Sequence, residues 1–321
     1  MNLLSASVIS TEIFQNFEEN LRLSITEDKF INETCTPLIQ GGKRLRPMLF
    51  LLCANSVEKL PLKETLPLAT ALELIHTASL VHDDILDSSK KRRGIETANS
   101  KYGAQIAVLI GDYLFAKAFQ LVAEGNYGAE VSLILSNLVK NLCRGEMQQD
   151  LSLYTVPTMA EYYERIRLKT AIFLATCCRL GGIAAGLNRN AVEGLTDYGN
   201  SLGLAFQIVD DLLDYFGDEK VTGKTPGSDL KSGVITLPVI RALKVSGESK
   251  TLHGIAVQRN LTQRDVHEAV KIVRTTDAFN YCILRATAHI DAARFSLPTV
   301  IKNSVKLELE QVADFVVMRN N

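Results

Sequence analysis

The apolar residues of this 321-residue chain recur mostly at every third or fourth position, the spacing of a helix buried along one face. Near the C-terminal end, for example, Val266 and Val270 follow Thr262 and Asp265, which form a helix-capping pair. Alternating strand-like runs bounded by Asn-Gly or Asp-Gly turns are absent from the sequence, and so are internal repeats and flexible linkers. The pattern predicts an all-α fold with residues 1–321 in a single domain.

The overall composition excludes several classes of protein. Hydrophobic residues make up 46% of the chain and charged residues 22%, which is typical of a folded globular protein. A formal net charge of −1 argues against binding to nucleic acid. The six cysteines lack zinc-like spacing, so we expect reduced, mostly buried thiols. The N-terminus does not resemble a targeting peptide and the apolar runs look too short to span a bilayer, which predicts a cytoplasmic protein without a transmembrane segment.

Two Asp-Asp-x-x-Asp runs each end an apolar helical segment. The first contains Asp83, Asp84 and Asp87, and the second contains Asp210, Asp211 and Asp214. Residues three, four and seven apart share a helix face, so Asp83 and Asp87 lie on one face with His76, and Gln207 aligns with the second cluster. Carboxylates this crowded repel one another unless a positive charge is shared between them.

The oxygen donors of these two clusters suit Mg²⁺, which usually bridges protein carboxylates to the phosphates of a substrate. A single run of this kind would more often be a solvated acidic helix end. Two runs, each followed by basic residues, instead predict a site where Mg²⁺ and a phosphorylated substrate bind together.

A basic segment, GGKRLRP, agrees with this prediction. Gly41 and Gly42 end one helix, and a proline suits the first turn of the next. The intervening Lys43, Arg44 and Arg46 would lie at the start of that helix, where backbone N–H groups already favour an anion.

With these motifs in this order, and with TGKTPGSDLKSGVITLP after the second cluster, the chain resembles the trans-polyprenyl diphosphate synthases from about Gln40 to Pro238. The resemblance implies a helical bundle around a deep central cavity. It also implies Mg²⁺-dependent condensation of isopentenyl diphosphate with an allylic diphosphate. Family members are typically homodimers, and some long-chain members need a small partner subunit.

The resemblance also implies roles for individual residues. Direct Mg²⁺ ligands would be Asp83, Asp87 and Asp210, supported by Asp84, Asp211 and Asp214. The diphosphate of isopentenyl diphosphate would bind to Lys43, Arg46, His76 and Arg93. The allylic diphosphate would bind to Arg92, Lys169 and Lys224. Oriented dipoles near the developing cation would come from Thr170 and Gln207. His82 has no such match and is interpreted as structural.

One position departs from the family pattern. Many members have a lysine after the glycine of the DLxxG segment, whereas this chain has Val234. One contact to the allylic diphosphate would then be missing, unless Lys231 replaces it.

The first aspartate helix carries a prediction about product length. In the family, an aromatic residue four or five positions before the first aspartate stops chain growth early, and here those positions are Ser79 and Ala78. The small side chains predict a long product, of hexaprenyl to octaprenyl length, with Phe115 or Phe119 as possible floors of the cavity. Shorter, geranylgeranyl-type synthesis is the alternative.

Two further alternatives differ in class. A terpene cyclase would lack GGKRLRP and would normally replace the second cluster with an Asn/Ser/Glu pattern. A regulatory relative would have lost aspartates, and none is missing here. A catalytic subunit that depends on a partner chain remains open.

Overall fold

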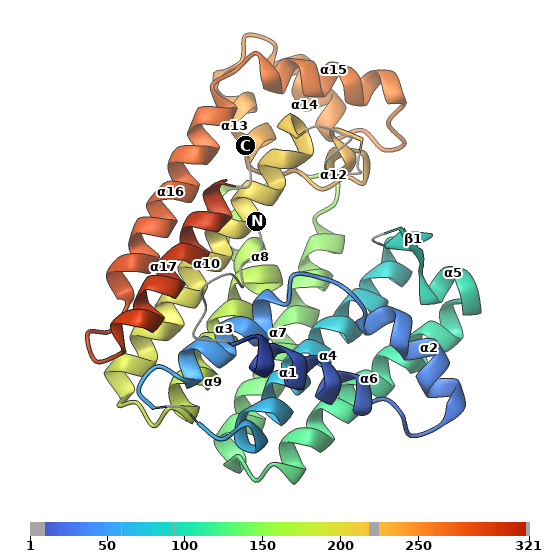
Figure 1. Cartoon of the computed structure of the whole chain (residues 1–321). Coiled ribbons are helices and arrows are strands. Elements are labelled where there is room, and N and C mark those ends of the chain that lie inside the picture. Colours follow the sequence, from blue (N-terminus) through green and yellow to red (C-terminus); the bar gives the residue numbers. More distant parts are fainter. Residues whose placement is uncertain (1–9, 59, 93, 218–224, 319–321) are drawn as a thin grey trace. The chain divides into compact units, whose positions relative to one another are not determined.

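The computed structural model describes residues 10–58, 60–92, 94–217 and 225–318 (Figure 1). Their contacts group into two units, each assembled from three stretches of the chain. Unit 1 contains residues 1–139, 176–192 and 299–308, and unit 2 contains residues 140–175, 193–298 and 309–321. The single domain over the whole chain stays a prediction.

Unit 1 is built on helix α4, Leu62–Leu86, which is buried on almost every side. A helix with apolar residues around its whole circumference needs neighbours on all faces. Helices α1, α2, α3, α5 and α6 pack against it, and the long α6 runs along it (Figure 1). The bounds of these helices are Thr11–Leu23 for α1, Lys29–Ile39 for α2, Leu45–Ala54 for α3, Ala98–Tyr102 for α5 and Ala104–Glu124 for α6.

A small hairpin follows α4. Strands β1, Lys91–Arg92, and β2, Ile95–Glu96, pair antiparallel, with Arg92 opposite Ile95. It is the one exception to the all-helical prediction among the described residues, and it places a basic side chain next to the first aspartate cluster.

Unit 2 carries the second aspartate cluster near the end of helix α10, Arg189–Phe216. The remaining helices with residues in this unit are α7 (Gly128–Leu151), α8 (Met159–Ile166), α9 (Ile172–Ala184), α12 (Ser228–Lys231), α13 (Leu237–Val245), α14 (Ser249–Ala256), α15 (Gln263–Arg274), α16 (Ala278–Ser296) and α17 (Asn303–Met318). Helices α7, α9, α10 and α17 also contribute residues to unit 1. The predicted capping pair is confirmed: Thr262 and Asp265 form a reciprocal capping box at the start of α15.

The segment EYYERIRLKTAIFLATCC is not one regular helix. Between α8 and α9 the chain widens into a π-helical turn, η1, Arg167–Ala171, which contains Lys169 and Thr170. Gly203 of α10 lies directly against this turn, because a Cβ atom there would come within 2.4 Å of Ala171 Cα. Short π-helical turns inside α-helices are frequent at functional sites.

Five of the six cysteines are buried and none forms a disulfide, in agreement with the expectation of mostly buried thiols. Among the described residues, α6 is long and apolar enough by length and composition to span a membrane. Core helices of soluble proteins pass the same test. The sequence prediction overlooked this segment when it judged the apolar runs too short.

Candidate functional site

The basic segment and helix α4 meet in unit 1. Arg46 lies in the first turn of α3, and its Nη1 atom is 3.0 Å from Nε2 of His76 on α4. Because arginine can only donate, this contact needs a neutral imidazole that accepts at Nε2. Two of the residues predicted to bind isopentenyl diphosphate are therefore neighbours, and Lys43 is exposed in the adjoining loop.

Arg44 has a different place from the one that the sequence suggested. Sequence reasoning placed it with Lys43 and Arg46 as an anion-binding group, but its side chain turns inward and is only 4% exposed. It contacts carboxylates of Glu18 and Glu73 at 2.6 and 2.7 Å. A guanidinium held by two carboxylates is not placed to bind a phosphate.

The first aspartate cluster lies at the C-terminal end of α4. Asp87 is exposed and Asp83 is partly exposed, whereas Asp84 is 5% exposed. Both Nε and Nη2 of Arg92, on strand β1, lie 2.9 Å from Oδ1 of Asp84. Burial raises the pKa of Asp84, an effect that Arg92 partly offsets and that Asp87 reinforces.

The second cluster, in unit 2, also combines an exposed carboxylate with buried ones. Asp210 is exposed, whereas Asp211 and Asp214 are 3% and 8% exposed. Oδ2 of Asp211 accepts a 2.7 Å hydrogen bond from the Tyr162 hydroxyl, and Oδ1 accepts one of 2.8 Å from the Gln207 amide. Burial raises the pKa of Asp211 to about 6, although these two hydrogen bonds act in the opposite direction.

The hydrogen-bonded chain extends into the π-helical turn. The Thr170 hydroxyl donates a 2.6 Å hydrogen bond to Oε1 of Gln207, whose amide group in turn donates to Asp211. The structure therefore brings together Thr170, Gln207 and Asp211, which sequence reasoning had named separately.

Lys169, in the same π-helical turn, is held by helix α7. Its Nζ atom lies 3.2 Å from Oε1 of Gln149 and 3.3 Å from Oε2 of Glu146. Its side chain remains 35% exposed, and the two contacts fix the direction of its ammonium group.

Asp214 supports a neighbouring backbone segment. Its Oδ1 atom accepts from the backbone N–H of Ser228 at 3.1 Å and from the Ser228 hydroxyl at 2.5 Å. Its Oδ2 atom accepts from the backbone N–H of Asp229 at 3.2 Å. The third aspartate of this cluster therefore fixes the start of α12, just before the segment that contains Val234.

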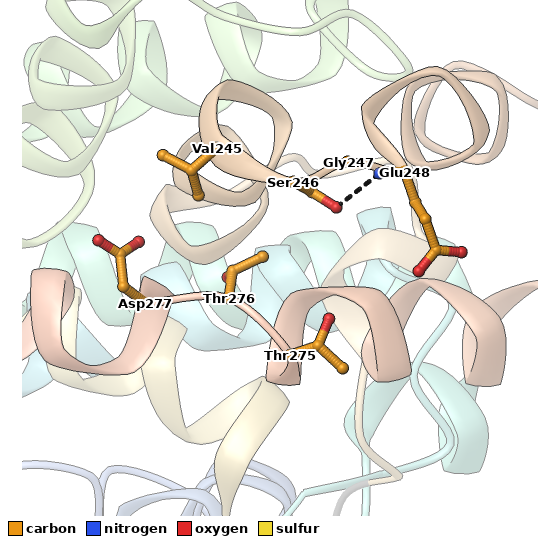
Figure 2. A pocket seen from close by; sticks show the side chains of 7 residues that line it. All are labelled: Val245, Ser246, Gly247, Glu248, Thr275, Thr276 and Asp277. Carbon is orange, nitrogen blue, oxygen red and sulfur yellow. Dashed lines mark hydrogen bonds between the residues drawn. The ribbon is translucent and has the colours of Figure 1, made fainter.

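An open hollow among the described residues lies elsewhere in unit 2. It has a volume of about 410 Å³ and lies between the turn after α13 and the turn between α15 and α16, as Figure 2 shows. Its lining includes Ser246, Glu248 and Asp277 and none of the predicted site residues.

Comparison with known proteins decides the family. The polyprenyl synthetase family model matches residues 28–273. The chain belongs to the polyprenyl synthetase family. The prediction of a prenyl diphosphate synthase, a prenyltransferase, is thereby confirmed, and so is the all-helical fold.

Three relatives illustrate the range within this family. A short chain isoprenyl diphosphate synthase of Methanocaldococcus jannaschii is 36% identical, with 96% of this chain and 94% of that protein covered. Heptaprenyl diphosphate synthase component 2 of Geobacillus stearothermophilus is 34% identical, with 98% of each covered. A Caulobacter crescentus polyprenyl synthase, solved with calcium and isoprenyl diphosphate, superimposes with a TM-score of 0.88 at 32% identity, covering 97% of this chain and 95% of that one.

The donor chemistry fits the divalent metal that a polyprenyl synthetase would use. The accessible carboxylates, Asp83, Asp87 and Asp210, offer only oxygen atoms, as hard cations require. In the part of the chain that the structure describes, no three His, Cys, Asp or Glu side chains are gathered as a ready-made metal site.

Two predicted residues, Arg93 and Lys224, lie outside the described residues. The interpretation of His82 as structural agrees with its position, since its ring packs against Phe115 and its Nε2 atom lies 3.2 Å from the Val108 carbonyl oxygen. Lys231 is exposed at the end of α12 and Val234 is partly exposed.

Sequence reasoning missed the supporting residues Glu18, Glu73, Glu146, Gln149 and Tyr162. Tyr162 and Asp211 are 49 positions apart, and no spacing rule links them. Glu73 carried a weak signal, because a charged residue within the apolar run of α4 needs a partner if it is buried.

Proposed function

We propose that this polyprenyl synthetase condenses isopentenyl diphosphate with an allylic diphosphate such as farnesyl diphosphate and produces a hexaprenyl to octaprenyl diphosphate. The observation that carries the proposal is the division common to both aspartate clusters. In each, the carboxylates expected to bind metal are accessible, while the supporting carboxylates are buried and held by the protein.

Mg²⁺ held by Asp83, Asp87 and Asp210 would neutralise the charge that develops on the leaving diphosphate. The calcium in the Caulobacter crescentus relative supports a divalent cation in this family. The buried carboxylates assist by position: Asp84 is fixed by Arg92, and Asp211 is fixed by Tyr162 and Gln207. Their neighbours in sequence are thereby held on the accessible faces of α4 and α10.

The basic residues divide between the two substrates. Lys43, Arg46, His76 and Arg93 would bind isopentenyl diphosphate, and Arg92, Lys169 and Lys224 would bind the allylic diphosphate. The C–O bond of the allylic diphosphate then breaks and the diphosphate leaves with the electron pair. The double bond of isopentenyl diphosphate attacks the resulting carbocation, and loss of a proton forms the new allylic double bond. Thr170 and Gln207 present oxygen dipoles that stabilise the cation.

Product length is proposed from the small residues before Asp83. Ala78 is fully buried, and the Ser79 hydroxyl donates a 2.8 Å hydrogen bond to the carbonyl of His76 on its own helix. Both side chains are small, so neither would block growth of the product along this face of α4. The likeness to a short chain isoprenyl diphosphate synthase supports a shorter product as the second candidate, and we propose geranylgeranyl length for it.

A homodimer in the cytoplasm remains the proposed form of the enzyme. Dependence on a small partner chain is the alternative, favoured by the likeness to heptaprenyl diphosphate synthase component 2 over 98% of each chain. Assay of the purified chain alone, and then with extract of its source organism added, tests the two. Activity only after addition would favour the heteromer.

A further inference from the structure

The loop between α2 and α3 has an unusual backbone. Gly41, Gly42 and Arg44 have φ angles of 72°, 90° and 51°. Glycine adopts positive φ without strain, but an arginine in this region is disfavoured by its Cβ atom. Such a conformation persists only where the surroundings over-determine it, and it tends to occur at functional sites.

The hydrogen bonds of the Arg44 side chain hold the backbone in this conformation. Nε and Nη2 contact the two carboxylate oxygens of Glu18 on α1 at 2.6 and 3.0 Å. Nη1 donates a 2.7 Å hydrogen bond to Oε1 of Glu73 on α4, and Nη2 also donates to the carbonyl of Ile39 at the end of α2. One guanidinium thus joins three helices that surround the loop.

The loop and the first turn of α3 contact α4 through two adjacent pairs of side chains. Glu73 receives Arg44, and His76, one helical turn further along α4, receives Arg46 at 3.0 Å. Glu73 and Arg44 are buried, with side chains 7% and 4% exposed, whereas Lys43, between Gly42 and Arg44, is exposed. The buried Arg44–Glu73 pair therefore fixes the register of the loop against α4, whereas Arg46 and His76 are partly exposed.

We propose that Arg44 and Glu73 are positioning residues that hold Lys43 and Arg46 in place for the diphosphate of isopentenyl diphosphate without touching it. The inference rests on the proposed function. It predicts that loss of the Arg44–Glu73 pair impairs one substrate selectively, because the partners predicted for the allylic diphosphate lie on other elements, such as β1 and η1.

The first variants are Glu73→Gln and Arg44→Lys. Lysine keeps the charge of Arg44 but lacks the planar fork that reaches two carboxylates and a carbonyl together. We expect the KM for isopentenyl diphosphate to rise roughly tenfold or more in each, with the KM for farnesyl diphosphate and kcat within about twofold of the wild type. Equal changes for both substrates, or no change for either, would overturn the proposal.

A loss of protein stability must be distinguished from a displacement of Lys43 and Arg46. The double variant Arg44→Met/Glu73→Leu removes the two buried charges at once, and the remaining carboxylate, Glu18, has a side chain that is 38% exposed and can be solvated. We expect its Tm to recover toward that of the wild type while its KM for isopentenyl diphosphate stays high. Recovery of both the Tm and the KM for isopentenyl diphosphate would mean that the Arg44–Glu73 pair acts on stability alone. Glu27→Gln, which removes the carboxylate that binds Lys117 and Tyr113 elsewhere in unit 1, is the matched control and should leave both KM values unchanged.

Calorimetric titration with isopentenyl diphosphate in the absence of metal gives a second readout, since the proposed partners of this diphosphate are all basic. Binding to the wild type that is weakened about tenfold by Glu73→Gln supports the positioning role. Unchanged affinity contradicts it. A wild-type enzyme that forms no product, alone or after addition of extract of its source organism, would instead refute the proposed function, and the two failures are therefore distinguishable.

Discussion

The hydroxyl of Tyr162 donates a 2.7 Å hydrogen bond to Oδ2 of Asp211, and both side chains are buried. The bond fixes the middle aspartate of the second cluster next to the accessible Asp210. We predict that Tyr162→Phe lowers kcat about tenfold and weakens the apparent affinity for Mg²⁺, as is common for residues that orient metal ligands. Steady-state kinetics over a Mg²⁺ titration measures both.

The control for this change is Tyr198→Phe. Tyr198 is equally buried in unit 2 and donates a 2.7 Å hydrogen bond to the Leu309 carbonyl. It should reduce Tm by a similar amount and leave the Mg²⁺ dependence unchanged. A similar loss of kcat in both variants would show that Tyr162 has no special link to the metal site.

The accessible aspartates lead to a second prediction. Asp83→Ala and Asp210→Ala should each lower turnover by roughly hundredfold or more, because each removes a proposed ligand of the metal. Their circular dichroism spectra should match the wild type, since Asp210 is exposed and Asp83 partly so. Near-normal turnover in either variant would refute the metal assignment.

Product length can be tested at Ala78. Ala78→Phe should shorten the products, seen when labelled polyprenols are resolved by chain length after removal of the diphosphate. The control is Ala69→Phe, which is equally buried but lies nine residues earlier on α4 and hence on its opposite face. Phenylalanine there should reduce stability by about 1–3 kcal/mol through overpacking and leave product length unchanged. Unchanged products from Ala78→Phe would count against the proposed cavity.

His289 provides a prediction about pH. Burial, reinforced by the Arg285 guanidinium, lowers the pKa of this histidine, whose ring packs against Tyr163 at a centroid distance of 5.6 Å. The unfolded chain therefore takes up a proton as pH falls below about 6.5, while the folded chain resists it, so acid favours unfolding. His289→Phe should lose less stability than the wild type between pH 7.5 and pH 5.5, values chosen to bracket the ordinary pKa of about 6.5.

Thermal unfolding at the two pH values measures this difference. His267→Asn, at an exposed position on α15, is the control and should follow the wild type. If His289→Phe showed the same acid-induced fall in Tm as the wild type, the stated role of His289 would be wrong.

The features that depend on local periodicity, above all the helices, could be predicted from the sequence. The apolar segments that end in the two aspartate clusters are helical, as their spacing predicted, and form parts of α4 and α10. The motifs and their order were enough to identify the family. The accessibility of Asp87 and Asp210 also agrees with their position on the polar side of a helix end.

Long-range contacts were beyond sequence reasoning. The inward turn of Arg44 depends on two carboxylates 26 and 29 positions away, which no local rule connects with it. The π-helical turn that contains Thr170 packs closely against Gly203 of α10, a contact that no local spacing rule connects with the turn. The β1–β2 hairpin was missed because each strand has only two residues.

The most direct test of the central claim is incubation of the purified chain alone with Mg²⁺, labelled isopentenyl diphosphate and farnesyl diphosphate, with the products resolved by length. The account predicts label in polyprenyl diphosphates of hexaprenyl to octaprenyl length. A geranylgeranyl product would preserve the reaction and refute the reading of Ala78 and Ser79. No incorporation into any longer diphosphate, alone or after addition of extract of the source organism, would contradict the account.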